Sequence, residues 1–266
     1  MPKQISAFEI RVMKNLMSDK TLAHWSSASV WGYAIKHKMT CMSRPTWYLY
    51  CKLLLLNRTR KRFKKVRKKN SVRADFPNQI WHMDVSIYKT LDGMKYYIYS
   101  IIDNFSRKIL AFDYSTELSA KTRLKSLKTA IGSLDQKQNI ELIVDGGSDN
   151  NNKTVSGFIK NCHVNLVKKV ALKNVVYSNS MIESSFRTLK SYYLKTGIPS
   201  DDFPNELSNA IEDINYKQPH YAHLIYTPDE IYQKPDLKPI FPKLQELKQQ
   251  RLQDNQGSNC DSDCKL

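Results

Sequence analysis

The chain has 266 residues, 41% of them hydrophobic, so it is long and apolar enough to bury a core, and an intrinsically disordered chain is excluded. Residues 1–73 carry 18 basic and two acidic residues, whereas residues 74–266 carry 24 and 23, so almost all of the net charge of +17 lies in the first part. This asymmetry predicts a basic region that holds a polyanion, followed by a nearly neutral domain that acts on it.

The five cysteines show no paired CxxC spacing, so the sequence indicates neither a disulfide framework nor a zinc site. The aliphatic run 53–56 is far too short to cross a membrane, and the first residues lack the apolar stretch of a signal peptide. We therefore expect a cytoplasmic protein without a membrane partner.

Three helices are expected near the N-terminus, at residues 5–24, 29–37 and 46–52. Ser43 is placed to cap the third helix, with Pro45 in its first turn. A helix, a short break and a capped helix are typical of a helix-turn-helix, although any small helical bundle has the same outline. We predict an all-α helix-turn-helix DNA-binding region over residues 1–56, with Arg44 among the DNA contacts.

A dense basic run follows this region, and it contains few side chains that could be buried. We predict that it forms a linker over residues 57–78 that lies along DNA phosphates, with a membrane-binding segment and a flexible solvated segment as the alternatives. Its nine basic residues are Arg58, Arg60, Lys61, Arg62, Lys64, Lys65, Arg67, Lys68 and Lys69.

The pattern then becomes strand-like. We predict three antiparallel strands in a meander, at residues 80–86, 95–102 and 108–114. A helix over residues 120–133, capped by Ser119, leads to the apolar run 141–144, which reads as a buried parallel strand. This order of elements is typical of the start of a ribonuclease H-like α/β fold.

Three acidic residues on these elements suggest a metal site. Asp84 lies in the middle of the first strand, where it shares a face with His82 and Ser86, and Asp145 directly follows the apolar strand. Carboxylate oxygens are the ligands that Mg²⁺ prefers, and two such ions can neutralise charge during phosphoryl transfer. We expect Asp84, Asp145 and Glu183 to bind the metal; Asp149, in an Asn-rich loop, is the rival for the second position.

Glu183 lies in a sequence that predicts a helix. Positions 183, 187 and 190 fall on one helical face, so Arg187 and Lys190 would stand one and two turns from the carboxylate and could hold a DNA phosphate. An ordinary exposed ion pair between Glu183 and Arg187 is the alternative.

Several ordered blocks carry a resemblance to a known family. The chain resembles the DDE transposases of bacterial insertion sequences with a retroviral-integrase-like catalytic core. The blocks are Trp81-His82-Met83-Asp84, residues 102–108, residues 144–148, residues 179–190, residues 216–220 and residues 227–232.

The resemblance implies a function and an architecture. Its catalytic and metal-binding triad would fall on Asp84, Asp145 and Glu183, with Lys190 as the DNA-contacting base. It implies a mixed five-stranded sheet with flanking helices over residues 79–198, before a helical extension over 199–253. From the sequence pattern we expect a last short helix over residues 244–252, and a disordered tail over the polar residues 254–266. It further implies two Mg²⁺ ions, with Mn²⁺ as a substitute.

The same resemblance predicts that the protein cleaves transposon ends and joins the freed 3′-hydroxyl to target DNA. The partners would be transposon-end and target DNA, further copies of the chain in a homo-oligomer, and a second DNA-binding polypeptide encoded by the element. The location would then be the nucleoid of a bacterial cytoplasm. Two alternatives stay open: a catalytically inactive, DNA-binding remnant or regulator, and a nuclease of the same fold that acts on RNA–DNA hybrids.

Overall fold

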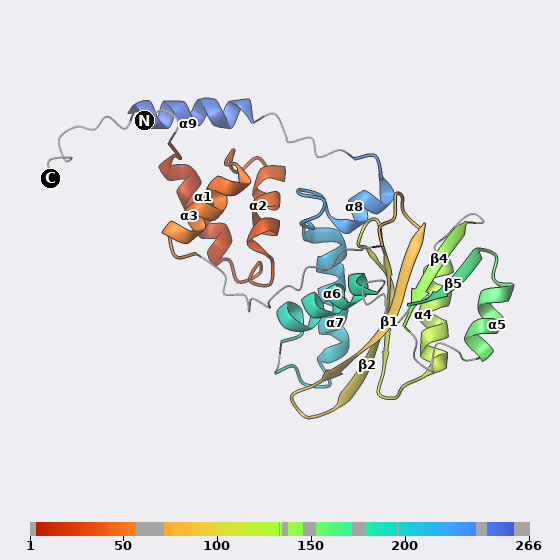
Figure 1. Cartoon of the computed structure of the whole chain (residues 1–266). Coiled ribbons are helices and arrows are strands. Elements are labelled where there is room, and N and C mark those ends of the chain that lie inside the picture. Colours follow the sequence, from red (N-terminus) through yellow and green to blue (C-terminus); the bar gives the residue numbers. More distant parts are fainter. Residues whose placement is uncertain are drawn as a thin grey trace. The chain divides into compact units, whose positions relative to one another are not determined.

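The structure is a computed structural model that describes residues 4–56, 72–132, 134, 138–145, 153–171, 179–195, 197–237 and 244–257 (Figure 1). The chain divides into two compact units. The helical unit contains residues 1–63, 218–227 and 237–266, and the core unit contains residues 64–217 and 228–236. The helices of the described part are all too short or too polar to span a membrane.

Three helices open the helical unit: α1 (Ala7–Ser18), α2 (Ser27–Lys36) and α3 (Arg44–Leu53). A serine hydroxyl caps each of them and accepts a hydrogen bond from a backbone N–H of the first turn, which would otherwise lack a helical partner. The cap predicted at Ser43 and the proline in the first turn of α3 are confirmed. Ser6 and Glu9 add a reciprocal capping box at the start of α1.

Residues from the C-terminal half complete the core of the helical unit. Trp31 and Trp47 are buried there, and their indole N–H groups donate to the Met42 carbonyl and the Ser27 hydroxyl. Ile225, 2% exposed, belongs to the same apolar cluster. The helix expected over residues 244–252 is found as α9 (Gln245–Gly257), so residues 254–257 of the predicted disordered tail are helical. Residues 258–266 of that tail lie outside the described residues.

A five-stranded mixed sheet forms the centre of the core unit, in the order β3-β2-β1-β4-β5. The antiparallel meander β1–β2–β3 and the parallel pairing of β4 with β1 agree with the sequence-based prediction. The strands are β1 (Ile80–Lys89), β2 (Lys95–Asp103), β3 (Ile109–Ser115), β4 (Asn139–Val144) and β5 (Asn165–Val170).

Each face of this sheet packs against its own helices (Figure 1). On one face, Trp81 and Met83 join the apolar cluster that contains Leu127 of α4 (Ala120–Gly132). On the other face, Ile182 of α6 (Ser180–Thr188) packs in a second cluster. The remaining helices are α5 (Lys153–Asn161), α7 (Phe203–Glu212) and α8 (Pro228–Gln233), with π-helical turns at Leu189–Tyr193 and Asp213–Lys217.

Candidate active site

Asp84 stands on the face of β1 that the helix α6 covers. The alternation along β1 places Trp81 and Met83 in the opposite cluster, as the sequence predicted. The Asp84 carboxylate accepts a 2.8 Å hydrogen bond from the Val85 N–H. Burial raises the pKa of Asp84 to about 6, and the negative charges of Asp145 and Glu183 add to the rise. The charges of both other acids therefore affect the ionisation of Asp84.

Asp145 leaves the sheet next to Asp84. Strands β1 and β4 are parallel, and Met83 pairs with Val144, so the two aspartates are the next residues on neighbouring strands. Val144 is fully buried, whereas Asp145 is exposed. The parallel register therefore brings two carboxylates side by side, although they lie 61 residues apart in the sequence.

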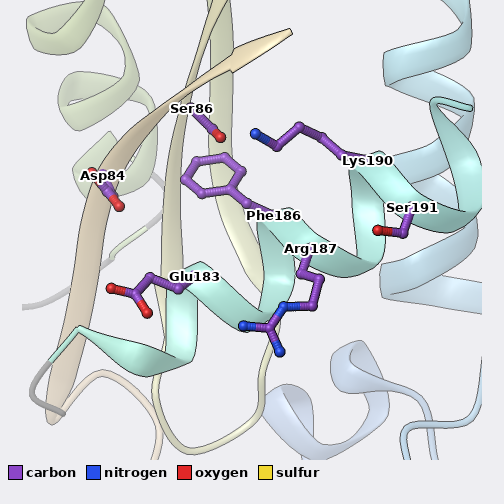
Figure 2. Close-up of a pocket in the computed structure, with 7 residues that line it drawn as sticks. All are labelled: Asp84, Ser86, Glu183, Phe186, Arg187, Lys190 and Ser191. Atoms are coloured by element: carbon purple, nitrogen blue, oxygen red, sulfur yellow. The ribbon is translucent and has the colours of Figure 1, made fainter. Parts of the chain in front are cut away.

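Glu183 lines an open pocket of about 350 Å³ together with Asp84, and Asp145 is not among the residues that line it. It lies in the first turn of α6, and in Figure 2 its carboxylate and that of Asp84 project into the same space between α6 and β1. The other residues that line the pocket are Ser86, Phe186, Arg187, Lys190 and Ser191.

The two basic residues predicted beside Glu183 do line this pocket. Arg187 is exposed, and Lys190 is half-buried at the π-helical turn that continues α6. The Lys190 Nζ donates a 3.1 Å hydrogen bond to the Ile87 carbonyl of β1. Burial lowers the pKa of Lys190, while the nearby charge of Asp84 acts in the opposite sense. Cationic and anionic side chains therefore face one another across a solvent-accessible space.

The donor chemistry of this site fits a hard divalent cation. Three carboxylates from β1, the end of β4 and α6 raise the local negative charge, which a cation would offset. Within the described ranges, however, no three His, Cys, Asp or Glu side chains gather closely enough to hold a metal ion. The assignment of these three acids as one metal site therefore stays a prediction, since the described side chains are spread more widely than in a closed metal centre.

Other predicted site residues lie elsewhere. Arg44 belongs to α3 of the helical unit, where its guanidinium lies 5.9 Å from the Tyr48 ring centroid. The basic run from Arg58 to Lys69 and the rival ligand Asp149 fall outside the described residues. Their roles stay predictions.

Sequence reasoning missed a buried polar network behind the triad. His82 hydrogen-bonds to Asn179 and Asn104, and all three side chains are buried. Both asparagines occur in blocks that carried the family resemblance, but nothing in their spacing showed that they meet. The alternation along β1 did predict that His82 shares a face with Asp84, but it gave no indication of the two asparagine partners.

Comparisons with known proteins agree with the fold. Residues 74–167 match the integrase core domain family. Transposase InsF for insertion sequence IS3A of Escherichia coli (strain K12) is 27% identical over 117 residues, which cover 44% of this chain and 40% of that protein. Transposase InsF for insertion sequence IS3 of Escherichia coli O111:H- matches to the same extent. The aligned region spans about 40% of the length of the curated relatives.

Solved structures show the same architecture. A chain in the cryo-EM structure of the simian T-cell lymphotropic virus intasome in complex with PP2A regulatory subunit B56 gamma superposes with a TM-score of 0.54 and 18% identity, covering 80% of this chain and 77% of that one. This likeness confirms the integrase-like, ribonuclease H-like fold. Residues 74–167 are therefore similar to integrase core domains, and the resemblance of this chain to the DDE transposases with such a core is confirmed.

Proposed function

We propose that the protein is a transposase that cleaves DNA at transposon ends and transfers the freed 3′-hydroxyl into target DNA. The observation that carries this proposal is the pocket in which Asp84 and Glu183 face each other beside Arg187 and Lys190. Acidic groups for metal and basic groups for phosphate occur there together, with Asp84 on β1 of the sheet and the other three residues on α6 and the turn that continues it. Metal-assisted phosphoryl transfer uses such groups to offset the charge on the reacting phosphate.

In this proposal Asp84, Asp145 and Glu183 hold two Mg²⁺ ions, for which Mn²⁺ can substitute. When bound, these ions supply Lewis-acid stabilisation of the attacking and leaving oxygens. The protein supplies rigid placement, because Asp84 lies within a central strand and Asp145 directly follows a buried one. Ionised carboxylates at these positions would hold the metal ions at a fixed place relative to the sheet.

Arg187 and Lys190 would hold the phosphate groups on both sides of the scissile bond. The guanidinium of Arg187 can contact two phosphate oxygens at once, and the ammonium of Lys190 acts as a point charge. Lys190 would exchange its hydrogen bond to the Ile87 carbonyl for a DNA phosphate. Arg44 and the basic run from Arg58 to Lys69 would contribute further DNA contacts outside the pocket.

The complete reaction joins two transposon ends to one target. We therefore propose that a homo-oligomer assembles on DNA in the bacterial nucleoid, and that a second DNA-binding polypeptide of the same element contributes to end recognition. Mixing two differently tagged copies of the protein with end DNA and capturing one tag tests the first point. Recovery of the second tag only with end DNA is the expected result.

The activity is tested with duplex DNA taken from the ends of the element that encodes the protein, incubated with Mg²⁺ or Mn²⁺. Asp84→Asn, Asp145→Asn and Glu183→Gln are each expected to abolish cleavage and joining. Glu141→Gln is the matched control, because Glu141 lies on β4 but pairs with Lys169 and does not line the pocket. Undiminished joining by the three triad variants would reject the proposal.

The open spacing of the carboxylates favours one alternative, a catalytically inactive remnant that binds DNA without cutting it. The two functions differ in their response to metal. A remnant would bind end DNA equally with and without Mg²⁺, and the wild-type protein would nick no strand. A transposase would show strand cleavage that requires the metal.

A further inference from the structure

A buried chain of hydrogen bonds joins the first strand of the sheet to the start of α6. His82 of β1 is 1% exposed, and its Nδ1 lies 3.1 Å from the Asn179 Oδ1. Its Nε2 lies 2.8 Å from the Asn104 Nδ2 in the turn after β2. Both ring nitrogens are therefore engaged, one toward each asparagine.

The backbone around Asn104 determines how this chain is oriented. The Asn104 Oδ1 accepts from the Ala74 N–H at 2.9 Å, and the Nδ2 donates to the Val72 carbonyl at 3.2 Å. These two bonds fix the amide, so that an N–H of Nδ2 faces the imidazole. The His82 Nε2 must then be the acceptor, and its Nδ1 must carry the proton that is donated to the Asn179 Oδ1.

Asn179 occupies the N-cap position of α6, where an asparagine side chain commonly accepts a hydrogen bond from the first helical turn. For the described start of α6, the structure shows no such bond from the Asn179 side chain. Its oxygen accepts from His82 instead, which ties the beginning of the helix to β1. In the same turn, the Glu183 N–H donates a hydrogen bond of 3.4 Å to the Asn179 carbonyl.

We infer that His82 is a positioning residue for Glu183: through Asn179 it fixes the first turn of α6 against the strand that carries Asp84, and Asn104 holds its ring in the required orientation. This inference rests on the proposed function, since it concerns the same triad. His82 and Asp84 are two residues apart on one strand, so their side chains share a face. A single rigid strand thereby determines the position of two of the three carboxylates.

Two substitutions separate the two halves of the chain of hydrogen bonds. His82→Asn places an amide N–H near the position of Nδ1 and can keep the bond to Asn179. His82→Gln places an amide oxygen near the position of Nε2 and can keep the bond to Asn104. Each variant loses one buried hydrogen bond, so both should be destabilised to a similar degree.

The positioning role predicts unequal functional losses. His82→Gln should lower the joining rate and the affinity for Mn²⁺ roughly 10–100-fold, as expected when a residue that orients a ligand is lost, while the KM for end DNA stays unchanged. His82→Asn should stay within about threefold of the wild type for the rate and for Mn²⁺ binding by calorimetry, because it keeps the orienting bond. Equal losses in both variants, in proportion to their stabilities, would overturn the inference.

A second pair of variants separates the positioning role from a general loss of folding and from failure of the proposed function. Asn179→Asp keeps an oxygen acceptor for His82, whereas Asn179→Leu removes it. Amide hydrogen exchange of residues 180–184 should be faster than in the wild type in Asn179→Leu and His82→Gln, and unchanged in Asn179→Asp and His82→Asn. This readout needs neither joining nor metal, so a protein that never joins DNA still tests the positioning role, and uniform exchange across the four variants would refute it.

Discussion

Arg251 holds Glu9 with two hydrogen bonds of 2.6 Å, from Nε and from Nη2, although 242 residues separate them in the sequence. Glu9 is almost completely buried and also accepts from the Thr40 hydroxyl and the Cys41 N–H. Burial raises the pKa of Glu9, but the bonds from Arg251, Thr40 and Cys41 outweigh it, so the pKa lies below its usual value. The carboxylate therefore connects α1, the segment before α3 and the C-terminal helix α9.

Removing the arginine should destabilise the helical unit. Arg251→Met leaves the Glu9 charge buried with fewer donors, which should cost about 3 kcal/mol. Denaturant unfolding followed by tryptophan fluorescence can measure this, because Trp25, Trp31 and Trp47 all lie in the helical unit. Lys248→Met, an exposed position on the same helix, is the control and should change stability little. Equal stabilities of both variants would show that the pair contributes nothing.

Gly32 of α2 is a second point where the C-terminal half meets the N-terminal helices. A Cβ atom at this position would lie 2.4 Å from the Leu224 carbonyl oxygen, which is backbone and cannot rotate away. Gly32→Ala should therefore destabilise the helical unit by about 2 kcal/mol, despite the better helix propensity of alanine.

Gly157 of α5 provides the matched control for Gly32. It also lies within a helix, but an added Cβ would meet nothing within 4 Å among the described atoms. Gly157→Ala should raise stability by about 0.5–1 kcal/mol. Calorimetric unfolding of both variants measures the two effects, and a stabilising Gly32→Ala would contradict the packing of residues 218–227 on α2.

The buried carboxylate of Asp84 should make stability depend on pH. Its pKa in the folded protein is about 6, above the ordinary value of 3.8, so the folded state binds a proton that the unfolded state has released between these values. Asp84 therefore costs stability above pH 6, and the cost disappears as the pH falls through 6 toward 4. Asp84→Asn should be more stable than the wild type at pH 7.5 by on the order of 2 kcal/mol, and equal to it near pH 4.

Chemical denaturation of the two proteins across this range, without divalent metal, gives the difference directly. Adding Mg²⁺ at pH 7.5 should then stabilise the wild type and leave Asp84→Asn unchanged, since ligand binding stabilises only a protein that retains the site. A pH-independent difference between the two proteins would contradict the electrostatic cost.

Lys190 and Arg187 should contribute phosphate contacts. Lys190→Gln and Arg187→Gln are each expected to weaken DNA binding for all sequences and to reduce the slope of log K against log salt by about 1. Titration of end DNA at several salt concentrations measures the slope. Lys217→Gln is the control, because Lys217 pairs with Glu212 and does not line the pocket. An unchanged slope in the pocket variants would place the DNA elsewhere.

Local sequence patterns predicted much of the fold. The alternation around Asp84 predicted which side chains of β1 share a face, because a strand repeats every two residues. In the structure, Trp81 and Met83 lie in the cluster that contains α4, whereas Asp84 and Ser86 line the pocket. The all-apolar run before Asp145 predicted a buried parallel strand for the same kind of reason. The resemblance implied a fifth strand, but the sequence pattern did not locate β5, since Lys168 and Lys169 interrupt the apolar pattern of this short edge strand. The helix α5 was not predicted either.

The sequence by itself determined which strands and helix carry the three candidate acids, and that Arg187 and Lys190 follow Glu183 on one helical face. These features depend on neighbours a few residues apart. Only the tertiary structure decided that His82 reaches Asn104 and Asn179, and that Arg251 reaches Glu9. Buried polar groups must find partners wherever the packed chain brings them, and no local period encodes a contact between residues 97 or 242 positions apart.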